Sequence, residues 1–154
     1  MSGTFFRAIP PDSDSTVFEP GYSFQGGNRY NPAGRLSALY FADDEYRAAL
    51  EANLSYGACA IYEVEAANLP GVVTLDENAL AALGLSLGQV TRPRLDTEGY
   101  RLCQTLGFAA FQAQGTGLLF PSALPGAPAR ARNLALFPAA LIPRSGLRVV
   151  SRAR

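Results

Sequence analysis

The 154 residues, 48% hydrophobic and 17% charged, fit one globular domain with a sizeable core and exclude a disordered chain. The formal net charge is zero, which argues against a general nucleic-acid binder, because such proteins gain affinity mainly by neutralising phosphates. No apolar run approaches the roughly 20 residues that span a bilayer. The N-terminus also lacks the basic and apolar blocks of a signal peptide, so we expect a soluble, cytoplasmic protein.

The first half of the chain is predicted to alternate strands with one long loop and one helix. The opening strand at residues 4–9 stops at a Pro-Pro pair, and a Gly- and Pro-rich stretch follows at 10–34. The aromatic residues in this stretch argue against a floppy linker. Apolar runs and periodic spacing then predict a strand at 36–42, a helix at 43–57 and a strand at 58–66.

The second half is predicted to add two helices and four short strands. One helix covers residues 76–84, with Asp76 as its N-cap, and a second covers 92–107, weakened by Gly99. Strands are expected at 109–113, 117–121, 133–137 and 147–152. A strand-rich order with three inserted helices favours an α+β fold over repeating βαβ units. No domain boundary is evident, so we predict one domain over residues 1–154.

The sequence lacks histidine, tryptophan and lysine, and every basic residue is arginine. Without histidine the chain has neither a Ser-His-Asp triad nor the usual zinc ligands, and without lysine it cannot form a Schiff base. Cys59 and Cys103 stand alone in apolar contexts, which predicts two buried thiols and no redox or metal motif. Any catalysis therefore depends on Arg, Glu, Asp, Tyr, Ser, Thr, Asn or Cys, and we expect no metal.

Arg29 and Tyr40 are the first candidates for ligand contacts. Arg29 follows a Gly-Gly pair and Asn28, and a guanidinium beside permissive backbone suits a phosphate or carboxylate. A surface Arg tied to a nearby carboxylate explains the same residue more simply. Tyr40 lies inside the apolar strand, where core packing is favoured over a role as an aromatic wall against a flat ring.

Glu51 lies on the helix after that strand. We expect Asp43 to cap this helix and Leu50 and Leu54 to define its buried stripe. Glu51 is beside the stripe, so its carboxylate either points into a cleft or pairs with Arg47 on the surface. In a cleft it could stabilise positive charge on a sugar carbon, as carboxylates do when glycosidic bonds break.

Ser122 and Asn133 lie at the ends of two predicted strands. Ser122 follows Pro121 at the exit of one strand, where turn formation competes with a role in orienting a ligand. Asn133 opens the next strand and has the same two explanations. Neither residue identifies a site by itself.

Two segments taken together resemble a known family. They are NRYNPAGRLSALYFADDEYRAALEANL, at residues 28–54, and GLLFPSALPGAPARARNLALFP, at 117–138. An Arg-aromatic-Asn-Pro run, an apolar strand, a helix with Glu, and a Pro-Ser-Ala element before a final strand occur in the order found in the RES domain. That family is named for its Arg, Glu and Ser, and it forms the toxin half of RES–Xre toxin–antitoxin systems. The resemblance covers about residues 6–51 and 117–137.

The resemblance implies an ADP-ribosyltransferase-like fold, with a twisted or split β-sheet, and an enzyme that acts on NAD+ as its substrate. By motif position, it assigns the catalytic roles to Arg29, Glu51 and Ser122. It assigns binding of NAD+ to Arg29, Tyr30, Tyr40, Ser122 and Asn133.

The expected reaction is cleavage of the nicotinamide–ribose bond of NAD+ by hydrolysis or phosphorolysis. Arg29 would grip the pyrophosphate, and Glu51 would stabilise the ribose oxocarbenium. Neutral nicotinamide leaves without a general acid, which suits a chain without histidine. Alternatives are an ADP-ribosyltransferase that modifies a host protein and a catalytically silent module that binds a partner. A hydrolase using the acids at 43–45 is disfavoured, because helix capping explains them.

The resemblance also implies an Xre-type antitoxin, with a helix-turn-helix DNA-binding domain, that covers the active site. Contact with DNA would then belong to the antitoxin, which is consistent with the zero net charge of this chain. A homodimer within a toxin–antitoxin complex is left open.

Overall fold

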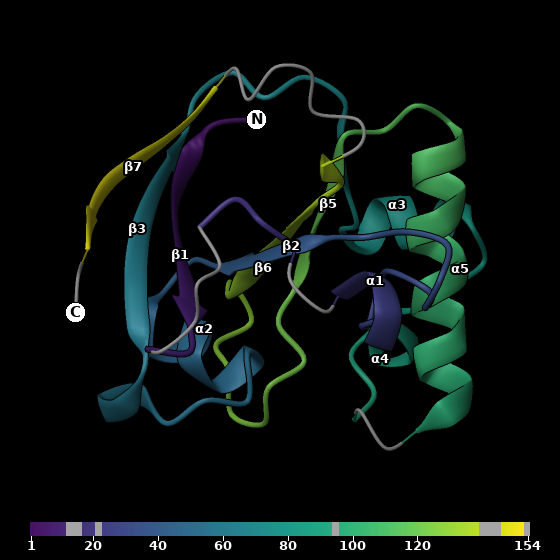
Figure 1. The fold of residues 1–154 in the computed structure, drawn as a ribbon. Coiled ribbons are helices and arrows are strands. Elements are labelled where there is room, and N and C mark those ends of the chain that lie inside the picture. Colours follow the sequence, from purple (N-terminus) through teal and green to yellow (C-terminus); the bar gives the residue numbers. More distant parts are fainter. Residues whose placement is uncertain (12–16, 21–22, 94–95, 139–145, 153–154) are drawn as a thin grey trace.

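A seven-stranded mixed sheet forms the centre of the fold (Figure 1). The computed structural model describes residues 1–11, 17–20, 23–93, 96–138 and 146–152. The strand order is β4-β5-β6-β2-β1-β3-β7, and all neighbouring strands run antiparallel except β4 and β5. The strands are β1 (Gly3–Ile9), β2 (Leu39–Ala42), β3 (Ala60–Ala66), β4 (Val72–Thr74), β5 (Gly117–Pro121), β6 (Arg132–Leu136) and β7 (Leu147–Arg152).

The helices cover two different parts of this sheet. In Figure 1, α1, α3, α4 and α5 gather beside β5, and α2 lies against β1. Their bounds are α1 (Ser23–Gly26), α2 (Glu45–Glu51), α3 (Glu77–Ala82), α4 (Leu87–Val90) and α5 (Thr97–Gln112), with a 3-10 turn at η1 (Tyr56–Ala58). None of the described helices has the length and apolar character that crossing a membrane requires. The α+β class predicted from the sequence is confirmed.

The N-cap of α2 lies one residue later than predicted, and the helix ends sooner. Asp44, not Asp43, is the N-cap, and its side chain accepts a bond from the backbone N–H of Arg47 at 3.0 Å. Asp43 instead binds the Arg47 guanidinium at 2.6 Å and the backbone N–H of Arg132 at 3.0 Å, which ties the helix to β6. The helix ends at Glu51, and Asn53 then takes a left-handed conformation with φ of 56°.

Helix α5 begins and ends five residues later than predicted, and the strand expected at 109–113 is wrong. The helix continues to Gln112, where Phe111 packs edge-on against Phe137 with centroids 5.8 Å apart. A short apolar run suits a strand or a buried helix equally, and here packing decides. Helix α3 and its Asp76 cap are confirmed, since that side chain accepts from the backbone N–H of Ala79 at 2.8 Å.

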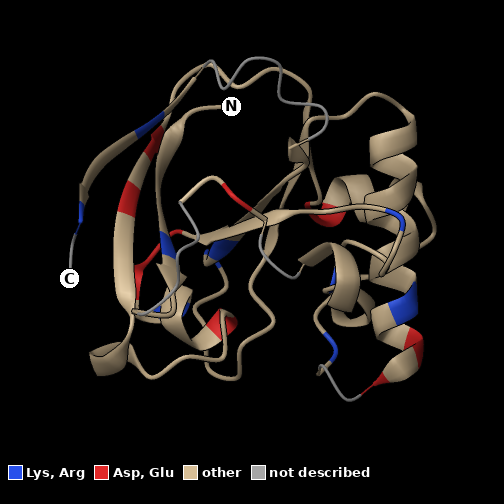
Figure 2. Cartoon of the chain, in the orientation of Figure 1, with Lys and Arg blue, Asp and Glu red and all other residues tan. Residues whose placement is uncertain are grey.

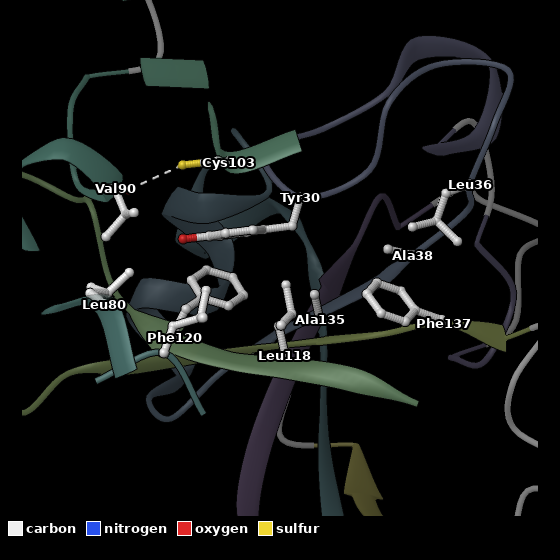
Figure 3. Close-up of a cluster of buried hydrophobic side chains, with 11 residues drawn as sticks. Tyr30, Leu36, Ala38, Leu80, Val90, Cys103, Leu118, Phe120, Ala135 and Phe137 are labelled. Carbon is white, nitrogen blue, oxygen red and sulfur yellow. Dashed lines mark hydrogen bonds between the residues drawn. The ribbon is translucent and has the colours of Figure 1, made fainter. Parts of the chain in front are cut away.

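The core between the sheet and helices α3, α4 and α5 is built around Tyr30 and Phe120 (Figure 3). Their ring centroids lie 4.2 Å apart, and Tyr30 is fully buried. Cys103 belongs to the same cluster and donates its S–H to the carbonyl of Val90 at 3.5 Å. Cys59 and Cys103 are both buried thiols, as predicted.

At the far end of the sheet, β7 is an exposed strand that carries Arg148 and Arg152. Arg148 on β7 pairs with Glu65 on β3 at 2.7 Å, and Ser151 donates to Glu63 at 3.0 Å. Figure 2 shows these basic and acidic positions on neighbouring strands. The pair is largely exposed, so it adds little stability.

Candidate active site

A cavity of about 720 Å³ lies against the sheet and is lined by residues of α1, α2 and α5 as well as by strand residues. Ligand sites of this kind usually span about 300–1,000 Å³, so its size suits a dinucleotide. Four residues predicted from the sequence line it, and they come from a loop, two strands and a helix: Arg29, Tyr40, Glu51 and Asn133. The fold therefore brings together an arginine and a carboxylate that are separated by two structural elements in the chain.

Glu51 is the last residue of α2 and points to the ends of β5 and β6. Its Oε1 accepts a hydrogen bond from Ser122 Oγ at 2.8 Å and another from Asn133 Nδ2 at 2.6 Å. No surface pair with Arg47 occurs among the residues described, because Arg47 binds Asp43. Two hydrogen bonds to one oxygen fix the direction of the carboxylate.

The stripe of α2 that was expected to be buried is corrected by the structure. Leu50 is 42% exposed at the rim of the cavity, whereas Ala48 and Ala49 are buried. Two small side chains let α2 lie close to the sheet, and this orientation turns Leu50 and Glu51 together toward the cavity.

Ser122 and Asn133 reach Glu51 from adjacent strands. Ser122 directly follows β5, and Asn133 lies on β6 opposite Phe120. A carboxylate only accepts hydrogen bonds, so the Asn133 amide nitrogen must face Glu51. Asn133 is 4% exposed. Its place on β6 puts its side chain at the end of the cavity where Glu51 lies.

Arg29 contacts the end of α4 and the first turn of α5. Its Nη1 donates to the carbonyls of Val90 at 3.3 Å and Arg92 at 2.9 Å, and its guanidinium carbon lies 5.7 Å from the Tyr100 ring centroid. Among the described residues it has no carboxylate within 4 Å, so the simpler explanation of a surface ion pair does not apply.

The structure explains one of the two glycines before Arg29, Gly27. It has φ of 65°, and a Cβ at this position would lie 2.8 Å from the backbone nitrogen of Ala33. The next residue, Asn28, exchanges backbone hydrogen bonds with Asn31 at 2.9 and 3.2 Å. This tight turn requires glycine and fixes where Arg29 leaves the loop.

Tyr40 lies between the cavity and the buried loop. Its ring lines the cavity, and its hydroxyl accepts from the Tyr30 N–H and donates to Asn31 Oδ1, both at 2.9 Å. Burial raises the pKa of Tyr40 far above its usual value, so the hydroxyl stays protonated and keeps donating. Asn31 is fully buried and donates in turn to the carbonyls of Ser23 and Leu36.

Replacing Tyr40 with Phe is expected to lower the free energy of unfolding by about 1–3 kcal/mol, because Tyr30 and Asn31 lose a shared partner. Urea titration measures this loss. The matched control is Tyr46→Phe, because Tyr46 is 53% exposed and its loss should stay within about 0.5 kcal/mol. Equal losses in the two variants would contradict a structural role for the Tyr40 hydroxyl.

Tyr30 does not lie where the sequence-based role requires. Its side chain is fully buried against Phe120 (Figure 3). Tyr30 is not among the residues that line the cavity. The loop turns the Arg29 side chain toward the cavity and the next side chain into the core. Tyr30 therefore acts through packing and through its backbone N–H, and of the two tyrosines only Tyr40 lines the cavity.

The structure adds two residues that sequence reasoning missed, Arg7 and Tyr100. Arg7 donates to the carbonyls of Val17 and Glu19, both at 2.7 Å, and has no carboxylate within 4 Å among the residues described. Burial lowers its pKa to about 10, so it stays charged at neutral pH. An arginine inside an otherwise apolar strand was the available signal for Arg7, whereas nothing in the sequence singled out Tyr100.

Over the part of the chain that the structure describes, no group of three His, Cys, Asp or Glu side chains could hold a metal ion. The polar side chains that line the cavity include arginine, carboxylate, hydroxyl and amide groups.

Comparison with known proteins places the chain in a family. The family model of the RES domain matches residues 4–151, including the middle of the chain, which the motifs did not cover. Among solved structures, the chain is similar to one in the crystal structure of the M. tuberculosis MbcT–MbcA toxin–antitoxin complex. The TM-score is 0.74, the identity is 23%, and the match covers 98% of this chain and 82% of that one. No curated protein matches. This chain belongs to the RES domain family.

Proposed function

We propose that this protein cleaves the bond between nicotinamide and ribose in NAD+, and that it is the toxin of a toxin–antitoxin system. One observation carries the proposal: Glu51, held by Ser122 and Asn133, shares a cavity of dinucleotide size with Arg29. Membership of the RES domain family supports the same reading.

In this mechanism the C–N bond breaks, and its electron pair stays on the nicotinamide nitrogen, which becomes neutral. The ribose carbon becomes positively charged, and the fixed carboxylate of Glu51 stabilises that charge. Ser122 and Asn133 hold the carboxylate so that it needs no reorientation during the reaction. Water, phosphate or a protein nucleophile then bonds to the same carbon.

The pyrophosphate carries two negative charges, and Arg29 and Arg7 offer positive charge along the cavity wall. Arg29 makes the principal contact, since a guanidinium binds phosphate oxygens in pairs. The ring of Tyr40 forms a wall for the nicotinamide riboside half.

The partner we propose is an antitoxin of the Xre type, with a helix-turn-helix DNA-binding domain, that covers this cavity. The similar solved structure is itself a toxin–antitoxin complex. Co-expression from the native operon should yield the two proteins together, and adding the antitoxin should stop nicotinamide release.

The direct test is to incubate the purified protein with NAD+ and quantify nicotinamide by chromatography. Arg29→Ala should raise KM about ten- to hundredfold, the equivalent of losing one or two charge-assisted hydrogen bonds. Arg148→Ala is the matched control, because Arg148 is an exposed arginine on β7 and does not line the cavity. Equal KM values in both variants would contradict the role of Arg29.

Three reaction mixtures identify the acceptor: water alone, added phosphate, and a cell extract with labelled NAD+. Label on a protein would favour ADP-ribosyl transfer over hydrolysis or phosphorolysis. If wild-type protein releases no nicotinamide in any of the three, the proposed reaction is wrong and a silent partner-binding module becomes the better explanation.

A further inference from the structure

Tyr100 is the aromatic residue that α5 contributes to the cavity. The guanidinium carbon of Arg29 lies over its ring, 5.7 Å from the centroid, which is within the range where a cation is attracted to an aromatic face. Tyr100 and Tyr40 line the same cavity. It therefore faces the same space as the residues that line the cavity from the sheet.

The guanidinium is held from a second direction by backbone carbonyls. Nη1 of Arg29 donates to Val90 and Arg92, and these bonds involve only one of its three nitrogens. A planar guanidinium carries five N–H donors in a fixed fork, so a ring and two carbonyls together fix the plane in which the fork lies.

Helix α5 is itself fastened to the loop that carries Arg29. Gln104 donates to the carbonyl of Asn28 at 3.1 Å, and Gly107 passes so close to Tyr30 that a Cβ would lie 1.8 Å from its carbonyl oxygen. Tyr100, Gln104 and Gly107 follow the i, i+4, i+7 spacing of one helix face. This face presents Tyr100 to Arg29 in a defined position.

We propose that Tyr100 is a positioning residue that aims the Arg29 guanidinium and so sets the affinity of the cavity for the diphosphate of the substrate. Arg29 and Tyr100 lie at the α5 side, whereas Glu51 ends α2 on the other side of the molecule in Figure 1. The ADP half of the substrate accordingly binds at the α5 side and the nicotinamide riboside half at the α2 side. The inference rests on the proposed function for the identity of the ligand.

The test uses ADP, which carries the diphosphate but neither the scissile bond nor nicotinamide, and measures its affinity by titration calorimetry. Tyr100→Leu should weaken ADP binding about three- to thirtyfold, the range expected for losing a cation–π contact. Tyr100→Phe keeps the ring and should restore the wild-type affinity. The matched control is Tyr62→Leu, because Tyr62 also lies under an arginine, Arg152, at 6.0 Å but does not line the cavity.

A second arm separates positioning from direct contact. In an Arg29→Gln background, adding Tyr100→Leu should cause no further loss of ADP affinity, because Tyr100 acts through Arg29. The same loss in both backgrounds would overturn the inference, as would unchanged affinity in Tyr100→Leu or no ADP binding by the wild-type protein.

The two proposals can fail separately. A protein that releases nicotinamide from NAD+ but shows none of the expected ADP pattern keeps the proposed reaction and loses the role of Tyr100. A protein that shows the ADP pattern but releases no nicotinamide keeps the role of Tyr100 and loses the reaction.

Discussion

Replacing Glu51 with Gln is expected to reduce the rate of nicotinamide release by about a hundred- to a thousandfold, while ADP binding and the fold stay unchanged. Gln has the shape of Glu, and its carbonyl oxygen can still accept from Ser122 and Asn133 at the position of Oε1. Only the negative charge is lost. The rate should therefore report how much that charge stabilises the developing positive charge on the ribose.

The measurement is single-turnover release of nicotinamide at saturating NAD+, so that weaker substrate binding does not contribute. Glu45→Gln is the control, because Glu45 is on the same helix but binds the Tyr56 hydroxyl at 2.8 Å and does not line the cavity. Its rate should match the wild type.

Ser122→Ala should fall between these two variants. It removes one of the two bonds that fix Glu51 but leaves the charge and the bond from Asn133 in place. A Glu51→Gln protein as fast as the wild type would show that the carboxylate takes no part in the chemistry.

Most of the sheet was predictable because its strands follow simple patterns. Strands β1, β2, β3, β5, β6 and β7 all fall on apolar or alternating runs bounded by turn residues. Strand β4, at Val72–Thr74, was missed because it is a three-residue strand with two exposed positions, which leaves no pattern to detect. Helices α1 and α4 span only four residues each and were missed for the same reason.

Part of the candidate site was predictable as a set of residues, but its geometry was not. Ordered motifs identified Arg29, Glu51, Ser122 and Asn133, and all but Ser122 line the cavity. Ser122 instead reaches the site through its bond to Glu51. Periodicity alone put Leu50 in the core, because it counts apolar residues and cannot know that two alanines let α2 lie close to the sheet.

The direction of a side chain leaving a loop was beyond sequence reasoning altogether. Arg29 and Tyr30 are adjacent, yet one faces the cavity and the other is fully buried. The Gly27 turn and the bond from the Tyr30 N–H to the Tyr40 hydroxyl decide which of the two side chains faces the cavity. Neither contact can be read from the sequence. Arg7 was missed for a related reason, because the strand pattern predicts its face but not that this face borders a cavity.

Replacing Gly107 with Ala is expected to have the largest effect on stability, a loss of about 3 kcal/mol or more in the free energy of unfolding. The new Cβ would lie 1.8 Å from the carbonyl oxygen of Tyr30, and that carbonyl is backbone, so it cannot rotate away as a side chain would. Alanine favours a helix over glycine by only about 1 kcal/mol, which does not offset the collision.

Urea titration of Gly107→Ala against Gly88→Ala tests this, because Gly88 is also a helical glycine but a Cβ there meets only Ser86 Oγ, at 3.9 Å. Gly88→Ala should be neutral or stabilising by up to about 1 kcal/mol. Equal free energies of unfolding in the two variants would show that α5 does not approach the Tyr30 backbone so closely. In any Gly107→Ala protein that still folds, α5 must move away from Tyr30. Since Tyr100 is on the same face of that helix, such a protein should also lose affinity for ADP, which links the packing of one glycine to the aim of Arg29.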